Sequence, residues 1–393
     1  MTPRLLYTSF DEVPGPKGAS THIEAFTRAL GARFGDVVLV TPGSQDEELR
    51  EVFPNVRQLV MGVPGENPIA RARVFRAKLK DVLQRQVFDV IHFRSIFEGL
   101  PLTDSNLTRG AALVYEANGF PSIELKYHYR KVAGDDGLLA RLQQQESSCL
   151  TAADRVLTIS DVTASYIASQ GVPDHRISVI RNGVDKTAFP FQPPPDAATA
   201  EILQLCYVGT LTGWQGIDTL IKATELVRQH RPVRLTIMGP QPKHRRAQLD
   251  KLVRRLNLDG DVAFAPSGSK TAVCELLHNS HFCCVPLLAV DRNTVQGCCP
   301  LKLIEAMCAG CPVIASDLPV VRELAEPNTH FAAARAGDAK NLRNVVLELT
   351  ADRNRVQTMV HAANQLATSL SWDNATTQLI AVYEQLLASS KPN

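Results

Sequence analysis

The chain contains 393 residues, of which 45% are hydrophobic and 21% charged, and its formal net charge is +2 at pH 7. This length exceeds what one ordinary hydrophobic core supports, so two domains are expected. The small net charge argues against a dedicated nucleic-acid-binding protein, which usually carries a strong basic excess, so no nucleic-acid partner is expected.

Short β-branched runs alternate with longer helical patterns along the chain. A first series of expected strands covers 4–8, 36–41, 89–93, 112–116 and 155–160, and a second covers 203–208, 234–238, 262–264, 282–285 and 312–315. Strands separated by helices form βαβ units, so the expected fold class is α/β with two doubly wound, Rossmann-like domains. A ligand cleft is expected between the domains, at the carboxyl ends of the strands.

The proline-rich stretch 191–198 lies between the two series of strands and can continue neither a helix nor a central strand. It is the expected linker between an N-terminal domain, 1–190, and a C-terminal domain, 199–370. A final helix is expected over 371–389. Its apolar residues recur at helical spacing: Leu379, Val382, Tyr383 and Leu386.

The loop after the first expected strand contains Gly15 and Gly18 but lacks the G-x-G-x-x-G pattern of dinucleotide-binding folds. The stretch 267–271 likewise lacks the adjacent Gly-Lys of a P-loop, so neither a nicotinamide enzyme nor a P-loop ATPase is favoured. Backbone near Gly18 leads into a helix around Ser20 and could approach a phosphate or sugar closely. A glycine that merely permits a tight turn explains this loop equally well.

Two basic clusters and the cysteines have ordinary explanations. Five basic residues at 71, 73, 76, 78 and 80 accompany apolar residues at helical spacing, which is typical of a crossover helix with a solvated face. A basic amphipathic helix that touches anionic lipid is the alternative, and Lys243–Arg246 is expected to be a solvated helix start. No leader and no apolar run of roughly 20 residues is present, so a cytoplasmic protein is expected, with peripheral contact at the inner membrane face as its variant.

The nine cysteines include adjacent pairs, which suit buried small side chains better than a disulfide framework. Cys308 and Cys311 form one C-x-x-C motif across an expected helix end, and no second motif follows at zinc spacing. A lone C-x-x-C is a weak signal, so a structural role is favoured and no metal site is expected.

Residues 297–317 are the most informative stretch, with a loop, a short helix that opens at Pro300, a glycine stop at Gly310 and a buried strand. The free N–H groups at a helix start bind phosphates, and Lys302 adds a positive charge one turn before Glu305. The Glu305 carboxylate could accept ribose hydroxyls, so this stretch is a candidate nucleotide-diphosphate site. The ordinary alternative is an exposed pair between Lys302 and Glu305, worth only ~0.2–0.5 kcal/mol.

Residues 207–216 form a second glycine-rich turn that could face the same diphosphate. In the first domain His92, Arg94 and Asn118 end strands, where the cleft is expected. A lone histidine is more often structural, so a structural role for His92 is the competing interpretation.

Taken together, these residues resemble those of glycosyltransferase family 4, whose enzymes have the GT-B architecture. The resemblance covers nearly the whole chain and rests on the loop around Gly18, on 179–185 and 207–216, and most heavily on 300–316. It implies two facing Rossmann-like domains, with the terminal helix crossing back to the first. It also implies retaining transfer of a hexose from a UDP-, GDP- or ADP-linked sugar to a glycan, lipid or small-molecule acceptor, with no required metal or other cofactor.

By this resemblance the C-terminal domain binds the donor and the N-terminal domain binds the acceptor. Glu305 matches the glutamate that holds the donor ribose, and the N–H groups of Leu301 and Lys302 would face the diphosphate. The implied donor-binding residues are Gly18, Gly209, Thr210, Gln215, Arg292, Gly297, Pro300, Leu301, Lys302 and Glu305. The implied acceptor-binding residues are His92, Arg94 and Asn118.

Three features depart from the family pattern. Gly297 stands where a glutamate usually touches the donor sugar, and Thr210 and Gln215 replace an arginine and a lysine that commonly neutralise the diphosphate. Asn118 stands in place of a histidine near the reacting carbon. A subgroup of the family carries Trp-Gln-Gly and Pro-Leu-Lys variants, so these are read as subtype features.

The leaving diphosphate still needs compensation for its developing charge. Lys302 is therefore the leading catalytic candidate, with Arg292 behind it, and Asn118 is the candidate from the first domain. Two alternatives stay open: a GT-B sugar-nucleotide epimerase, which needs no acceptor, and a non-catalytic protein that holds a nucleotide sugar without turnover.

Overall fold

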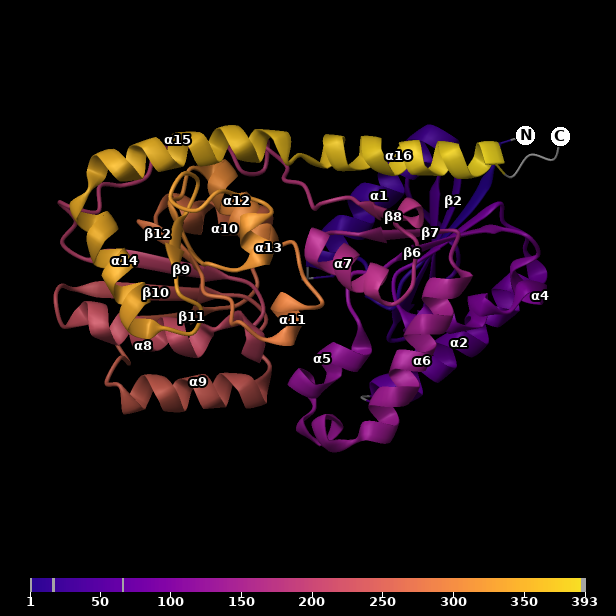
Figure 1. The fold of residues 1–393 in the computed structure, drawn as a ribbon, viewed down its shortest axis with the longest axis horizontal. Helices are drawn as coiled ribbons and strands as arrows, with labels where there is room; N and C mark the ends of the chain where they lie inside the picture. Colours follow the sequence, from indigo (N-terminus) through magenta and orange to yellow (C-terminus); the bar gives the residue numbers. More distant parts are fainter. Residues whose placement is uncertain (1, 16–17, 66, 390–393) are drawn as a thin grey trace. The chain divides into compact units, whose positions relative to one another are not determined.

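The computed structural model describes residues 2–15, 18–65 and 67–389. Contacts within the chain divide it into two compact units, 1–181 with 375–393 and 182–374. Each unit is a parallel-rich sheet covered by helices, which confirms the predicted α/β class (Figure 1).

The first unit contains an eight-stranded sheet of order β3-β4-β2-β1-β5-β6-β7-β8, in which only β3 and β4 are antiparallel neighbours. The strands are β1 (Arg4–Thr8), β2 (Asp36–Gly43), β3 (Arg50–Phe53), β4 (Val56–Gly62), β5 (Val90–Phe93), β6 (Ala112–Glu116), β7 (Arg155–Thr158) and β8 (Ile177–Val179). The five strands predicted here occur as β1, β2, β5, β6 and β7. Because β1 lies between β2 and β5, the connections run to opposite sides and create a switch point between β1 and β5.

Helices and short 3-10 turns connect these strands. The helices are α1 (Gly18–Phe34), α2 (Pro68–Arg85), α3 (Ile96–Gly99), α4 (Ser105–Thr108), α5 (Pro121–His128), α6 (Asp136–Ala152) and α7 (Asp161–Ser169). The turns are η1 (Leu100–Thr103), η2 (Arg130–Gly134) and η3 (Asp174–Arg176). A buried apolar core joins the central strands to α2 and α6 and includes Phe75, Leu79, Phe93 and Cys149.

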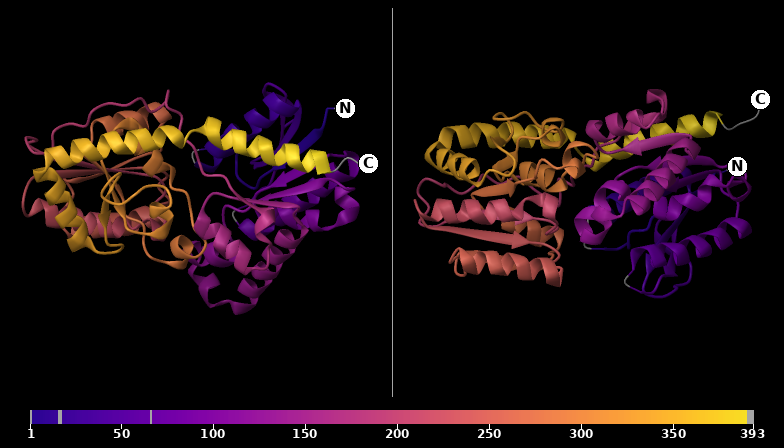
Figure 2. Two further views of the ribbon diagram at one scale, coloured as in Figure 1. Left: turned by 45° about the horizontal axis from the view of Figure 1, so that its top comes forward. Right: turned by 60° about the horizontal axis from the view of Figure 1, so that its bottom comes forward.

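Helix α16 (Trp372–Ser389) ends the described chain and belongs to the first unit from Ala375 onward. Its four predicted apolar residues are all buried, which confirms the helical pattern. The Tyr383 hydroxyl lies 2.8 Å from His92 Nδ1, and Glu384 pairs with Arg33 of α1 at 2.6 Å. Figure 2 shows α16 lying along the first unit.

The second unit contains a six-stranded, all-parallel sheet of order β11-β10-β9-β12-β13-β14. The strands are β9 (Leu203–Val208), β10 (Val233–Met238), β11 (Val262–Ala265), β12 (Phe282–Val285), β13 (Val313–Ser316) and β14 (Ala332–Ala334). All five strands predicted in this part occur, and β14 was not predicted. The chain passes from β9 outward through β10 and β11 and returns to β12, so the switch point lies between β9 and β12.

Helices cover both faces of this second sheet (Figure 2). They are α8 (Ile217–Arg228), α9 (Lys243–Arg255), α10 (Lys270–His278), α11 (Asp291–Thr294), α12 (Leu301–Ala309), α13 (Pro319–Arg322), α14 (Ala339–Ala351) and α15 (Arg353–Ser369), with the turn η4 (Gly213–Gln215). Apolar residues of α8, α9 and α14 pack with β9 and β10 in one core, which includes Leu220, Leu249 and Val346.

The contact boundary falls between Arg181 and Asn182, so the proline-rich stretch 191–198 lies inside the second unit. Gln192 N donates to Ala309 O at 3.1 Å, and Ala197 is buried in the second core. The stretch that was expected to serve as a linker therefore packs against the end of α12.

None of the nine cysteines, all within the described part of the chain, forms a disulfide, and eight of them are buried, which confirms the prediction of buried small side chains. Cys308 Sγ lies 3.3 Å from Phe189 O, so the C-x-x-C region packs against the backbone of the second unit. Among the residues that the structure describes, no helix is long and apolar enough to cross a membrane.

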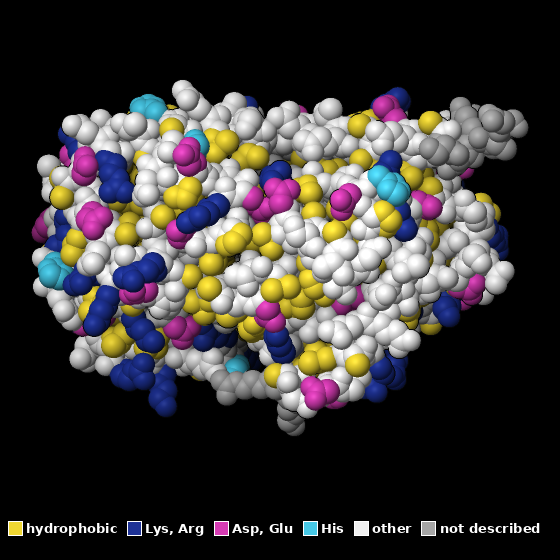
Figure 3. All heavy atoms as spheres, in the orientation of Figure 1, with side chains coloured by type: hydrophobic (Ala, Val, Ile, Leu, Met, Phe, Trp, Pro, Cys, Tyr) yellow, Lys and Arg dark blue, Asp and Glu magenta, His cyan; other side chains and the backbone are white. Residues whose placement is uncertain are grey.

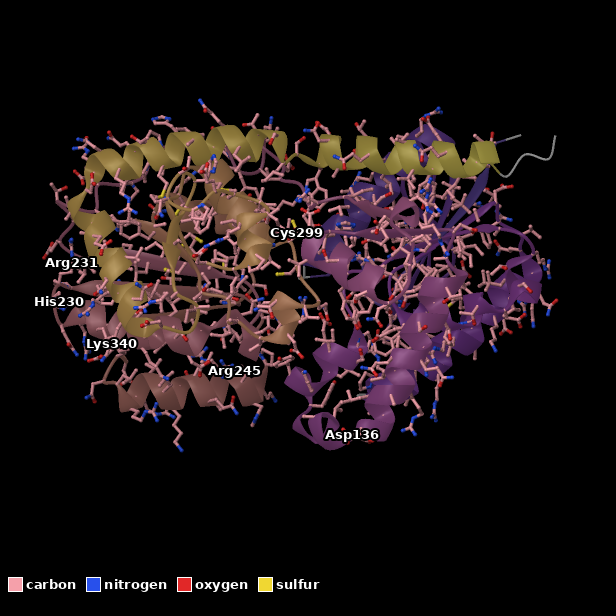
Figure 4. All side chains as sticks on the ribbon, in the orientation of Figure 1. Asp136, His230, Arg231, Arg245, Cys299 and Lys340 are labelled. Carbon is pink, nitrogen blue, oxygen red and sulfur yellow. The ribbon has the colours of Figure 1, made fainter. Side chains whose placement is uncertain are left out.

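The two basic helices differ in how their charges are used. In α2, Arg76 donates to Phe97 O of α3 at 2.8 Å and Lys78 donates to Asp46 at 2.7 Å, so these cations hold α3 and the loop after β2. Helix α9 begins at the predicted Lys243 and carries Lys and Arg side chains at the lower left of Figure 3. Its Arg245, labelled in Figure 4, pairs with Asp218 of α8.

Candidate functional site

The loop from β12 to α12 brings the predicted phosphate-binding stretch to the carboxyl edge of the second sheet. Pro300 immediately precedes α12, and Gly310 ends it with φ +83°, as the sequence predicted. A side chain at Gly310 would overlap Gln192 O, so glycine is required there for packing as well as for conformation. Asn182 Nδ2 anchors the loop through Cys299 O at 2.9 Å; Figure 4 labels Cys299.

The start of α12 has the properties of an anion site. Within the described residues, no side chain caps its first turn. Uncapped N–H groups and the helix dipole favour a negatively charged ligand at this end. The position of this end, close to the β9–β12 switch point, is where ligands bind to open α/β sheets.

Lys302 reaches from α12 to the loop after β9. Its Nζ donates to the Tyr207 hydroxyl at 2.8 Å and to Gln215 Oε1 at 2.7 Å, and it lies 4.0 Å from the centre of the Tyr207 ring. Both hydrogen bonds go to neutral groups of the β9 side, so Lys302 is not the exposed helix-surface cation of the ordinary alternative. Burial lowers the pKa of Lys302 to about 7, with partial opposition from neighbouring thiols and Glu305.

Gly209 makes the approach of Lys302 possible. It directly follows β9 with φ +136°, and a Cβ at this position would lie 2.8 Å from Lys302 Nζ. The Tyr207 hydroxyl also donates to Thr210 O at 2.6 Å, which fixes the turn that carries Gln215. Thr210, Gln215 and Lys302 are thus brought together, whereas the sequence alone showed only that two loops leave one sheet.

The remaining donor-side candidates occupy the same edge of the second sheet. Arg292 donates to Gly297 O at 2.6 Å, and its guanidinium lies 5.4 Å from the centre of a Trp214 ring, so it stabilises its own loop. Glu305 is half-buried one turn after Lys302. Burial raises the pKa of Glu305 to about 7, and Lys270 and Lys302 oppose the shift. Leu301 begins α12 beside them, whereas Gly18 begins α1 in the first unit.

In the first unit, the predicted residues surround a carboxylate that sequence reasoning did not single out. Glu116 ends β6 and is 1% exposed. Its oxygens accept from Tyr7 at 2.7 Å and His92 at 2.9 Å, lie 2.9 Å from His22, and also bond Asn118. Arg94 completes the set at 3.4 Å. We call these groups the Glu116 cluster.

Charge compensation keeps the buried Glu116 carboxylate ionised. Burial alone would raise the pKa of Glu116, but Arg94, His22 and hydrogen bonds hold it well below the usual range. Burial lowers the pKa of His92, and Glu116 opposes the shift. A glutamate in the buried run Leu-Val-Tyr-Glu was the available sequence signal, because a charge rarely enters a core without partners.

A pocket of about 500 Å³ adjoins the Glu116 cluster at the carboxyl ends of β1, β5 and β6. Arg94 and Asn118 line it. His92 does not line it: it is fully buried, and its ring nitrogens face Tyr383 and Glu116. The expected ligand contact of His92 is therefore replaced by a structural role, because both of its polar atoms are used inside the protein.

Comparisons with known families and structures agree with this two-unit architecture. A model described as Glycosyltransferase Family 4 matches residues 16–188, and a model described as Glycosyl transferases group 1 matches 203–352. The sucrose-phosphate synthase of Thermosynechococcus elongatus superposes with a TM-score of 0.81 over 98% of this chain and all of that chain, at 21% identity. Anabaena HepE, solved in complex with UDP, gives 0.73 over 97% of this chain and 100% of that chain at 17% identity.

Curated sequences give the same indication. A putative colanic acid biosynthesis glycosyltransferase, WcaL of Escherichia coli K12, is 30% identical over 48% of this chain and 46% of its own length. The D-inositol 3-phosphate glycosyltransferase of Mycobacterium tuberculosis H37Ra is 26% identical over 93% of this chain and 75% of its own length. The chain spans about half the length of WcaL and AmsK, the first of these relatives. The chain has the GT-B glycosyltransferase fold, with one Rossmann-like unit for each of its two domains, and it belongs to glycosyltransferase family 4.

Proposed function

We propose that this protein is a glycosyltransferase that moves a hexose from a nucleotide sugar to an acceptor hydroxyl, with retention at the anomeric carbon. The observation that carries the proposal is Lys302, a cation held by neutral partners beside an uncapped helix start at a topological switch point. A diphosphate bound at this place would supply the negative charge that the site lacks. The UDP and UDP-glucose complexes of HepE support a UDP-hexose as the first donor to test, with GDP and ADP sugars following.

The proposed chemistry is stabilisation of the departing diphosphate. As the sugar–phosphate bond breaks, negative charge grows on the phosphate oxygens, and the Lys302 ammonium and α12 N–H groups oppose it. A bound diphosphate would also raise the pKa of Lys302 and keep its amine protonated, since opposite charge favours the charged form. The leaving phosphate takes the acceptor proton, and the Glu305 carboxylate accepts hydrogen bonds from the hydroxyls of the donor ribose.

The proposed acceptor side is the pocket of the first unit, whose lining includes Arg94 and Asn118. Asn118 would orient the acceptor or the transferred sugar through its amide. The proposed setting is the cytoplasm, with Arg73 and Lys80, the two exposed cations of the predicted α2 cluster, available for peripheral contact with anionic lipid. No metal is required in this scheme, so EDTA is expected to leave the initial transfer rate unchanged.

The decisive experiment measures transfer from a panel of nucleotide sugars to mixed acceptors by wild type, Lys302→Ala and Glu305→Ala. Lys302→Ala should lower kcat by ~10²–10³, as expected when a preorganised stabiliser of developing charge is removed. Lys251→Ala, an exposed cation of α9, is the matched control and should retain full rate. Full activity in both Lys302→Ala and Glu305→Ala would contradict the assignment of these residues to the donor site.

Incubation without acceptor separates the alternatives. A sugar-nucleotide epimerase would convert the donor to its isomer under these conditions, whereas the proposed transferase would leave the sugar's configuration unchanged. Tight nucleotide binding with neither transfer nor isomerisation across the panel would instead identify a binding protein. Thermal shifts report that binding, because a ligand of the folded state raises Tm.

A further inference from the structure

The pocket of the first unit contains groups that discriminate between classes of acceptor. Its lining combines apolar rings with charged and amide side chains, and six of its residues carry the argument: Phe10, Asp11, Arg71, Arg94, Asn118 and Glu124. The volume of about 500 Å³ is typical of small-molecule sites. All the lining residues lie in the first unit, so the pocket can be described without the second.

Both guanidinium groups in the lining already have carboxylate partners. Arg94 lies 3.4 Å from Glu116, and Arg71 donates to Glu12 at 3.2 Å and to Val63 O at 3.1 Å. Asp11 and Glu124 add two further carboxylates to the lining. The pocket therefore has no excess of positive charge to offer a phosphate, and an anionic group would lie beside carboxylates that repel it.

Two polar atoms at the base of the pocket are left without partners. Among the described residues, neither Arg94 Nε nor Asn118 Oδ1 makes a hydrogen bond, although Arg94 is only 7% exposed. The orientation of the Asn118 amide follows from chemistry, because its Nδ2 bonds the Glu116 carboxylate, which can only accept. One unsatisfied donor and one unsatisfied acceptor therefore sit on neighbouring side chains of one cluster.

A hydroxyl group satisfies both kinds of atom, since it can accept from an N–H and donate to a carbonyl oxygen. A phosphate oxygen or a carboxylate can only accept and would leave Asn118 Oδ1 unpaired. Carboxylates such as Asp11 and Glu124 accept from further hydroxyls, and the Phe10 ring offers an apolar face. Both atoms are buried, so a ligand hydroxyl would reach them only after the Arg94 and Asn118 side chains move.

We propose that the acceptor group bound in this pocket is an uncharged, polyhydroxylated ring, that is, a sugar residue without phosphate or carboxylate. That the bound group is an acceptor rests on the proposed function, but its binding in the pocket can be measured without a donor. The sequence left open a glycan, a lipid or a small molecule as acceptor, and an uncharged sugar ring corresponds to the end of a glycan. Arg94 and Asn118 act as specificity-determining residues, and Glu116 positions both of them.

The test measures binding to the full-length protein by calorimetry, with no nucleotide sugar present. The probes are methyl glycosides of glucose, mannose and galactose, each paired with the corresponding hexose 6-phosphate. At least one methyl glycoside should bind, and at least ~10-fold more tightly than its phosphorylated counterpart, the ratio expected when one charged contact is unfavourable. Equal or tighter binding of the phosphates, or no binding of any methyl glycoside at millimolar concentration, would overturn the proposal.

Variants locate the effect in this pocket. Glu124→Gln should weaken methyl glycoside binding several-fold and narrow the discrimination against the phosphate, because it removes an acceptor and a repulsive charge together. Glu48→Gln, an exposed carboxylate of the same unit outside the pocket, is the matched control and should change neither affinity. Unchanged discrimination in Glu124→Gln would also contradict the proposal. Failure of transfer with this binding intact would contradict the proposed function instead.

Discussion

The two candidate sites handle buried charge in opposite ways. In the first unit, Glu116 accepts hydrogen bonds from several side chains and lies 3.4 Å from the Arg94 guanidinium, so its negative charge is compensated inside the protein. In the second unit, Lys302 bonds only neutral groups, Tyr207 and Gln215, and burial lowers its pKa to about 7. A compensated cluster provides rigid positioning, whereas an uncompensated cation is completed by an anionic ligand. In the proposed scheme, this difference is the reason why the pocket of the first unit takes a neutral acceptor and the Lys302 site takes a diphosphate.

The largest expected effect is a loss of stability when the Glu116 cluster is disrupted. Glu116→Gln removes the negative charge and leaves the buried Arg94 without its counterion. Loss of one partner of a buried ion pair costs ~3–5 kcal/mol of unfolding free energy, which denaturant titration measures. Glu384→Gln, which breaks the exposed pair with Arg33, is the control and should cost at most ~1 kcal/mol. Similarly small losses of unfolding free energy in both variants would show that the Glu116 carboxylate does not stabilise its cluster.

The uncompensated charge of Lys302 should make the affinity for the nucleotide sugar depend on pH. With the pKa of Lys302 at about 7, the free protein loses this positive charge as pH rises through 7. Diphosphate binding then requires uptake of a proton, so UDP-glucose affinity should fall as pH rises from 7 to 8, by at most ~10-fold for one proton. Calorimetry between pH 6 and 8.5 measures this slope, and the diphosphate diester of UDP-glucose does not titrate there.

Two variants separate the contributions to that slope. Lys302→Arg keeps the charge at every pH and should flatten the profile above pH 7. Burial raises the pKa of the neighbouring Glu305 carboxyl to about 7, so this group could also contribute to the slope. Glu305→Gln removes it and should leave the decrease in affinity that Lys302 causes. A wild-type affinity that is independent of pH would mean that Lys302 stays charged in the free protein, and the contrast between the two sites would disappear.

The smaller of the two stability effects concerns the terminal helix. Tyr383→Phe removes the hydroxyl that lies 2.8 Å from His92 Nδ1, and leaves that buried nitrogen unpaired. The loss should be ~1–3 kcal/mol of unfolding free energy, measured by thermal or chemical denaturation. Tyr129→Phe, which alters an exposed ring in the same unit, should change stability much less. No loss in Tyr383→Phe would mean that the contact between the Tyr383 hydroxyl and His92 does not stabilise the first unit.

The sequence predicted most of the fold because strand and helix patterns are local. All ten expected strands and the α16 pattern appear, since β-branched runs and helical spacing reflect burial at fixed periods along the chain. The strands that were not predicted, β3, β4, β8 and β14, are mostly short or near a sheet edge. Such strands carry little periodic signal.

What the sequence by itself determined about the site was the loop, helix and glycine stop from Pro300 to Gly310, because capping and turn chemistry depend on neighbouring residues. Only the tertiary structure decided the partners of Lys302, which stand 95 and 87 residues away in the chain, and the clustering of Tyr7, His92 and Tyr383 with Glu116. Charge compensation is a property of three-dimensional proximity. It is created when strands far apart in sequence become neighbours in a sheet, and no local pattern records it.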